Sequence, residues 1–265
     1  MKKTFAQRAL ELDLLRGIAV ILMMFDHLMF DLCGLLPGFF WDYPLDLHFF
    51  AIDYWYWDVR LAVRPVILFV FFALTGICSS FSRSNLARGI KLLAVAVGLT
   101  VVTDLVGFFA GDENIRIVFG VLHAIAISLI LVGLLEKLHT NKWIYLVAGL
   151  ALWGVGIWID RKYNVGLVRY GDEPFWTQFG KAVLGFVEVG SDCFPLPRTA
   201  GQIFVGVFLG KQFYKERKSL IFKKYHRNPV AFLGRHSLLF YFAHQIVFPL
   251  LAALVLVCLG YQLFL

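Results

Sequence analysis

Apolar stretches of about 20 residues recur along this chain, and their recurrence constrains the fold more than any other feature. An α-helix of about 20 mostly apolar residues spans the hydrocarbon core of a bilayer, and it satisfies its backbone hydrogen bonds internally. Because 60% of the residues are hydrophobic and only 16% are charged, the sequence predicts an all-α, multi-pass membrane helix bundle rather than a soluble protein. We expect one integral membrane domain over residues 1–265, with about seven transmembrane helices. The expected spans are roughly 14–34, 60–81, 88–109, 116–136, 142–159, 197–213 and 237–262.

The positive charges predict how these spans are oriented. Lys and Arg gather in alternate loops, the longest being the basic segment 211–235, whereas most Asp and Glu lie in the other loops. Since basic residues stay on the cytoplasmic side, we expect the N-terminus inside and the C-terminus outside. Topology also accounts for the net charge of +7, so no nucleic-acid partner is expected. Segment 175–190 is aromatic and apolar but contains Lys181 and Glu188, and we interpret it as a helix in the outer interface; if it were a span, the C-terminal topology would invert.

Asp26 and His27 interrupt the first apolar stretch. An ionisable pair inside a bilayer costs several kcal/mol unless it is paired or hydrated, and such residues mark functional sites by default. An imidazole also suits proton transfer near neutral pH. The same histidine could instead hold helices together through a hydrogen bond, and the sequence leaves both interpretations open.

Two further ionisable residues are expected at the depth of His27. Asp104 lies about one and a half turns from the outer end of the third span, and His123 about two turns into the fourth. The three side chains could therefore meet in one polar cavity that opens to the outside. There Asp104 would orient His27, as carboxylates orient histidines in acyl-transfer sites. One rival interpretation is a haem protein with His27 and His123 as axial ligands; another is a proton-coupled transporter or flippase that uses the Asp/His cluster.

One face of the first span is polar over its length. Arg16 and His27 are 11 residues apart, which is about 20° around a helix of 3.6 residues per turn. Asp13 and Asp31 lie near the same stripe. We expect this face to look into the bundle, with Gly17 on the same side permitting close packing.

The candidate substrate-binding residues are Arg60 and Arg64, one turn apart, together with Asp26 and His244. Two guanidinium groups at this spacing suit an anionic group, although snorkelling to lipid phosphates explains them at least as well. His48, in the first outer loop, could be catalytic or incidental.

The two long outer loops, 35–59 and 160–196, are rich in Trp, Tyr and Asp. This composition suits either an aromatic belt at the membrane interface or sugar binding. Cys33 and Cys193 both fall on the outer side, and a disulfide between them stays open. The four cysteines lack a metal-ligand spacing, and no metal is expected.

Four stretches together resemble a known family. They are LDLLRGIAVILMMFDHL (12–28), FGVLHAIAISLIL (119–131), SDCFPLPRTAGQIFVGVFLG (191–210) and GRHSLLFYFAHQIV (234–247). Their order and spacing resemble the bacterial branch of the heparan-α-glucosaminide N-acetyltransferase catalytic-domain family, a relative of the wider transmembrane acyltransferases. The resemblance covers nearly the whole chain.

The resemblance implies transfer of an acetyl group from cytoplasmic acetyl-CoA to an amine or hydroxyl of an extracytoplasmic sugar or glycolipid. In the wider superfamily, the catalytic histidine lies in the first helix after an arginine-glycine opening, and His27 after Arg16-Gly17 matches this position. The lysosomal relatives carry asparagine there and place their active histidine in the following outer loop, where His48 is the nearest match. Which of the two histidines acts is open.

The same resemblance implies sites for coenzyme A and for partners. The phosphates of coenzyme A need basic groups, and the candidates on the inner side are Arg16, Arg83, Arg88 and Arg235. The expected location is a bacterial plasma membrane. The expected partners are membrane lipids and the sugar or glycolipid acceptor, and a homodimer is a further expectation.

Overall fold

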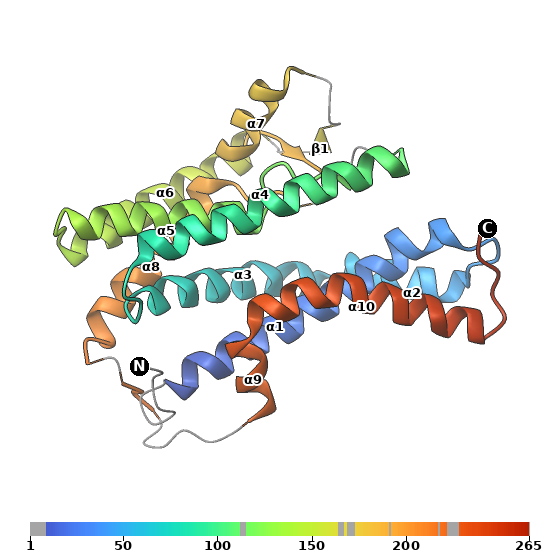
Figure 1. Cartoon of the computed structure of the whole chain (residues 1–265), viewed down its shortest axis with the longest axis horizontal. Helices are drawn as coiled ribbons and strands as arrows, with labels where there is room; N and C mark the ends of the chain where they lie inside the picture. The colour runs from blue at the N-terminus through green and yellow to red at the C-terminus, as the bar shows by residue number, and fades with distance from the viewer. Residues whose placement is uncertain are drawn as a thin grey trace. The chain divides into compact units, whose positions relative to one another are not determined.

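The computed structural model is built almost entirely of helices and falls into two compact units (Figure 1). The first unit holds residues 1–71 and 218–265, and the second holds residues 72–217. Within these bounds, the structure describes residues 9–111, 115–163, 167–168, 173–190, 192–216, 218–221 and 228–264.

The first unit joins the two ends of the chain. The elements of this unit are α1 (Leu10–Phe30), the π-helix η2 (Asp31–Leu35), the 3-10 helix η3 (Leu36–Phe39), α2 (Leu45–Trp55), the first part of α3 (Asp58–Ser79), α9 (Pro229–Arg235) and α10 (Ser237–Cys258). Helix α3 begins in this unit and ends in the second.

The second unit is the middle of the chain. Its elements are the last turns of α3, α4 (Asn85–Ala110), α5 (Val121–Lys137), α6 (Lys142–Tyr163), β1 (Leu167–Val168), α7 (Phe175–Leu184), β2 (Glu188–Val189) and α8 (Leu196–Phe213). The two short strands pair in parallel, with Leu167 opposite Glu188. The sequence prediction of a single membrane domain stays a prediction, since two compact units sharing one helix are compatible with it.

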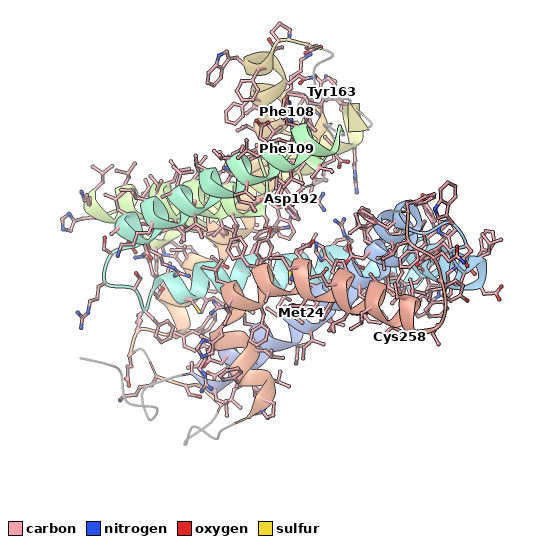
Figure 2. All side chains as sticks on the ribbon, turned by 45° about the vertical axis from the view of Figure 1, so that its right-hand side comes forward. Met24, Phe108, Phe109, Tyr163, Asp192 and Cys258 are labelled. Carbon is pink, nitrogen blue, oxygen red and sulfur yellow. The ribbon has the colours of Figure 1, made fainter. Side chains whose placement is uncertain are left out.

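Five helical segments in the described part of the chain are long and apolar enough to cross a membrane. They are Leu10–Phe39, Asp58–Ser79, Asn85–Phe109, Lys142–Tyr163 and Ser237–Cys258. Much of their apolar surface is exposed, as Phe108 and Phe109 at the end of α4 illustrate (Figure 2). In water such exposure would be unfavourable, so these helices are membrane helices. The chain is therefore an integral membrane protein with an all-α fold.

The remaining two expected spans, 116–136 and 197–213, coincide with α5 and α8. Helix α5 has 17 residues and α8 has 18. Both are largely buried, because α5 packs against α4 and α8, and α8 packs in turn against α6 (Figure 1). A helix covered by neighbouring helices presents little surface to lipid, which explains why α8 tolerates more polar residues than its neighbours.

Helix α1 is apolar on its exposed side and polar on its inner side. Arg16 and His27 are half-buried and Asp31 is buried, whereas Leu15 and Phe25 are exposed. This arrangement confirms the expectation that the polar stripe of the first span faces into the bundle. In a bilayer it is also the favourable one, since ionisable groups are costly in hydrocarbon.

Glycine allows α9 to cross α1 at very short range. A Cβ atom on Gly17 would clash with the backbone carbonyl of Val230, and one on Gly234 would clash with the carbonyl of Asp13. The same Cβ on Gly234 would lie 2.8 Å from the nitrogen of Gly17. The close packing expected at Gly17 is therefore present, and its partner is the glycine that opens the motif at 234–247.

Two helices lie where the sequence predicted only loops. Helix α2 occupies the middle of the expected loop 35–59, and α9 lies at the end of the basic segment 211–235. Both are short and lack a long apolar run, which is the signal that hydropathy detects. Helix α7 confirms that residues 175–184 are helical; with 10 residues it is about 15 Å long, about half of the hydrocarbon core, so it is not a span.

Candidate active site

The two intramembrane histidines of the first unit lie against each other. The ring centroids of His27 on α1 and His244 on α10 are 5.0 Å apart, and the ring planes are nearly perpendicular. His27 is half-buried and His244 is 2% exposed. Residues 217 positions apart in the sequence are thus brought together inside one unit.

Backbone carbonyls hold one nitrogen of each ring. Nδ1 of His27 lies 2.8 Å from the carbonyl oxygen of Met23, and Nδ1 of His244 lies 2.9 Å from that of Phe240. A carbonyl only accepts, so each neutral ring carries its proton on Nδ1 and a lone pair on Nε2. The amide nitrogen of Gln245 donates to Nε2 of His244 at 3.2 Å. The lone pair on Nε2 of His27 is thus the one suited to accept a proton from another molecule.

Asp26 forms a buried ion pair next to this histidine. Its carboxylate accepts two hydrogen bonds from Arg60 of α3, from Nε to Oδ1 and from Nη2 to Oδ2, both at 2.8 Å. The Tyr54 hydroxyl donates a third at 3.1 Å, and the Arg60 Nη1 group donates to the carbonyl of Trp55 at 3.0 Å. The guanidinium carbon also lies 3.7 Å from the centroid of the Trp55 ring. Asp26 and Arg60 therefore connect α1, α2 and α3.

Two of the expected substrate-binding residues, Asp26 and Arg60, thus bind each other. All three guanidinium nitrogens of Arg60 donate to these groups of the protein. Burial, and then the Asp26 carboxylate, raises the pKa of Tyr54, so its hydroxyl remains a donor at neutral pH. Substrate binding by Asp26, Arg60, Arg64 and His244 stays a prediction.

Two buried polar atoms beyond the C-terminal end of α1 have no hydrogen-bond partner in the part of the chain that the structure describes. They are Oδ2 of Asp31, in the π-helix η2, and Nδ1 of His48, on α2. Tyr43 contacts both segments: its hydroxyl donates to the carbonyl of Leu32 at 2.7 Å, and its ring centroid is 6.4 Å from that of His48. Burial raises the pKa of Tyr43 to about 12, so this hydroxyl also stays protonated.

The four arginines expected to hold coenzyme A divide between the units. Arg16 and Arg235 are half-buried and adjoin Gly17 and Gly234, at which α9 crosses α1, so the backbones of the two arginines lie close together. Arg83 and Arg88 are exposed around the start of α4, in the second unit.

His123 belongs to the second unit and caps a helix. Its Nδ1 accepts from the backbone nitrogen of Gly120 at 3.3 Å, at the first turn of α5. The Thr100 hydroxyl donates to the carbonyl of Ile117 at 2.8 Å, so its oxygen accepts from Nε2 of His123 at 3.2 Å. Asp192, labelled in Figure 2, accepts from Val121 at 3.0 Å at the same helix end. Both nitrogens of His123 are thus occupied, which argues against the haem interpretation.

Asp104 also lies in the second unit, where it pairs with Arg116 at 3.0 Å. Its side chain is 52% exposed. The Met23 carbonyl already holds the nitrogen of His27 that we expected Asp104 to orient. The expectation that Asp104 and His123 act as catalytic partners of His27 stays a prediction. Cys33 and Cys193 are free thiols.

Comparison with protein-family models gives a match over residues 8–246 to the family described as heparan-alpha-glucosaminide N-acetyltransferase, catalytic. The chain belongs to this family. The matched range contains His27, His48 and His244, and it spans both units. Searches of curated proteins and of solved structures found no match. Family membership indicates a membrane acyltransferase, and it confirms the resemblance to the family; membership of the bacterial branch stays a prediction.

Sequence reasoning missed Tyr54, Tyr43 and Asp31 as parts of this site. The composition of loop 35–59 leaves Tyr43 and Tyr54 open between an aromatic belt and sugar binding, and Asp31 is placed only on the polar stripe of the first span. One sequence signal was available for Asp31: it follows His27 by four residues and therefore falls on the same side of α1. No sequence signal paired Asp26 with Arg60.

Proposed function

We propose that this protein transfers an acetyl group from cytoplasmic acetyl-CoA to an amine or hydroxyl of an extracytoplasmic sugar or glycolipid. Family membership supports the acyl-transfer chemistry. The observation that carries the proposal is the state of His27, whose Nδ1 proton is committed to the Met23 carbonyl and whose Nε2 keeps its lone pair. A base for acyl transfer needs such a lone pair, held in one orientation.

The proposed reaction is base-assisted attack on a thioester. Nε2 of His27 removes a proton from the acceptor hydroxyl or ammonium, which frees a lone pair on its oxygen or nitrogen. That atom forms a bond to the acetyl carbonyl carbon, and the bond from this carbon to the sulfur of coenzyme A breaks. The thiolate takes up a proton, directly or through His27, and the products are the acetylated sugar and coenzyme A. An ammonium acceptor releases one further proton to solvent.

His244 supports this role of His27 as a neighbour. Its Nε2 accepts from Gln245 and its Nδ1 bonds to the Phe240 carbonyl, so the ring is in the neutral form. A neutral ring 5.0 Å away does not oppose the positive charge that His27 acquires when it takes a proton, whereas a second imidazolium would.

The donor set at the α1–α9 crossing fits the phosphates of coenzyme A. Arg16 and Arg235 come from two helices held together at Gly17 and Gly234, and guanidinium groups bind phosphate through two parallel hydrogen bonds. We infer that these two arginines hold the donor, and that the exposed Arg83 and Arg88 are candidates for the same ligand. Acetyl-CoA itself supplies the activated acetyl group.

The proposed topology has seven spans, with the N-terminus inside and the C-terminus outside in a bacterial plasma membrane. It adds α5 and α8 to the five apolar segments. At about 1.5 Å per residue, the 17 residues of α5 reach about 25 Å, close to the thickness of the hydrocarbon core. The N-in orientation places Arg16 and Arg235 on the cytoplasmic side, where acetyl-CoA is found.

The test is acetyl transfer in purified full-length protein reconstituted in vesicles, with radiolabelled acetyl-CoA and a panel of amino sugars. We expect His27→Gln to lower the rate of transfer about 10²–10⁴-fold, while His139→Asn, at an exposed loop position with φ 54°, serves as the matched control and keeps the wild-type rate. His48→Gln is measured alongside. If His48→Gln abolishes transfer and His27→Gln does not, the base is His48.

The same assay separates the enzyme from a transporter or flippase. Covalent label on the sugar supports acyl transfer. Movement of sugar or acetyl-CoA across the vesicle membrane without covalent label in the wild-type protein would reject the proposed function.

A further inference from the structure

The segment between α1 and the arginines of α3 is strongly acidic. Residues 31–59 contain five aspartates and neither lysine nor arginine. The aspartates are Asp31, Asp42, Asp46, Asp53 and Asp58. An acidic cluster on a surface is usually just solvated, so the charge alone does not indicate a ligand. The structure adds an observation about one member.

Asp31 is buried, and one of its carboxylate oxygens has no hydrogen-bond partner. The residue is 3% exposed, and Oδ2 is fully enclosed without a donor among the described residues. A buried carboxylate without a partner is costly, and unpaired buried polar groups in native proteins call for an explanation. Asp31 also begins the five-residue π-helix η2, and such π-turns occur frequently at functional sites.

Arg60, the first arginine after Asp31 in the sequence, does not meet this need. It uses Nε and Nη2 on Asp26 and Nη1 on the Trp55 carbonyl. Residues 32–59 contain neither lysine nor arginine. No lysine or arginine of its own segment therefore pairs with the carboxylate of Asp31.

A second buried atom of this unit also lacks a partner. Nδ1 of His48 has no hydrogen-bond partner among the described residues. Tyr43 links the two segments, because its hydroxyl bonds to the carbonyl of Leu32, the residue after Asp31, and its ring contacts the ring of His48. One tyrosine thus ties the backbone beside Asp31 to the ring of His48.

His27 lies one helical turn before Asp31. The backbone nitrogen of Asp31 donates to the carbonyls of His27 and Leu28, so the two residues are neighbours along α1. Side chains four residues apart on a helix have Cβ atoms about 5–6 Å apart. A group bound by Asp31 would therefore be close to the base proposed above.

We propose that Asp31 is a positioning residue that binds the amine of the acceptor beside His27, and that the acidic segment 31–59 selects amine-bearing sugars without negative groups over uronate- or phosphate-bearing ones. This inference rests on the proposed function. An ammonium has three donors, which suits the unpaired Oδ2 of Asp31 together with the lone pair on His27. Five carboxylates attract a cation and repel an anion, and at the edge of a low-dielectric bundle this effect is stronger than in water.

The first test uses the wild-type protein alone, so that folding of a variant does not enter. Transfer of radiolabelled acetyl is compared for methyl glucosaminide and for its 6-phosphate, which carries the same amine and two negative charges. We expect kcat/KM for the phosphate to be at least 10-fold lower at low salt, with the difference shrinking at high salt. Equal use of the two sugars, or preference for the phosphate, would overturn the selection.

The second test uses Asp31→Asn, which keeps the shape of the side chain and removes its charge. We expect KM for methyl glucosaminide to rise at least 10-fold, with KM for acetyl-CoA unchanged and the unfolding midpoint equal to or above that of the wild type. A merely structural role would move both KM values or the midpoint. The matched control is Glu188→Gln, an exposed carboxylate on β2 of the second unit and outside segment 31–59, for which KM stays within 2-fold.

A binding measurement keeps this inference separate from the proposed function. Equilibrium dialysis of tritiated methyl glucosaminide is carried out on wild type and Asp31→Asn without acetyl-CoA. Binding that is lost only in Asp31→Asn supports the acceptor site even if no acetyl transfer occurs, in which case the proposed function alone fails. Equal binding by the two proteins, or no binding by the wild type, would overturn the role of Asp31.

Discussion

The ion pair between Asp26 and Arg60 gives the sharpest prediction about stability. Asp26→Ala removes two charged hydrogen bonds at 2.8 Å and the hydroxyl bond from Tyr54 at 3.1 Å. The side chain of Arg60 is only 7% exposed, so its guanidinium would be left buried and without its anion. Removing one partner of such a pair costs about 3–5 kcal/mol, and we expect this loss in the free energy of unfolding.

The assay is equilibrium unfolding of the purified protein in mixed micelles, followed by circular dichroism. The matched control is Glu173→Ala, because Glu173 also forms an ion pair, with Lys181, but the two side chains are 39% and 40% exposed. An exposed pair is worth about 0–1 kcal/mol, so this variant stays close to the wild type.

A double-mutant cycle separates the ion pair from the loss of packing. We expect Asp26→Leu combined with Arg60→Met to recover most of the stability that either single change removes, since replacing both partners of a buried pair by apolar residues is often neutral. Destabilisation below about 1 kcal/mol in Asp26→Ala, or losses that simply add in the double variant, would refute the idea that a buried, uncompensated charge sets the cost.

Two further predictions concern packing and a thiol. Gly17→Ala is expected to lower the unfolding midpoint and to loosen α9, because the new Cβ would clash with the Val230 carbonyl. The control Gly98→Ala, with open space at that position in α4, should be neutral or stabilising by up to about 1 kcal/mol. Similar stability of the two variants would contradict this expectation. Burial raises the pKa of the Cys193 thiol to about 11. In a variant whose other cysteines are serine, the rate of alkylation of the folded protein should therefore be low at pH 8 and rise about 10-fold per pH unit up to that pKa, because only the thiolate reacts. A rate equal to that of the unfolded protein at pH 8 would rule out this burial.

Hydropathy and helical spacing were enough to predict the class of fold and the side of the first helix that faces inward. Hydropathy over about 20 residues reports whether a segment prefers lipid, and that preference depends only on the residues within the segment. The same locality explains why the polar stripe of Arg16, His27 and Asp31 was visible, since spacing along one helix fixes which side chains share a face. The family resemblance was likewise carried by contiguous stretches.

Tertiary structure decided which polar groups meet. Asp26 pairs with Arg60, 34 residues away, and His27 lies against His244, 217 residues away on α10. His123, which shares the expected depth of His27, caps α5 through Nδ1 and bonds to the Thr100 hydroxyl of α4 through Nε2. Depth along a helix gives one coordinate of a side chain, whereas contact also depends on the rotation and neighbours of each helix. Those are set by packing between distant segments, here at glycines where backbones touch, and they cannot be read from one segment alone.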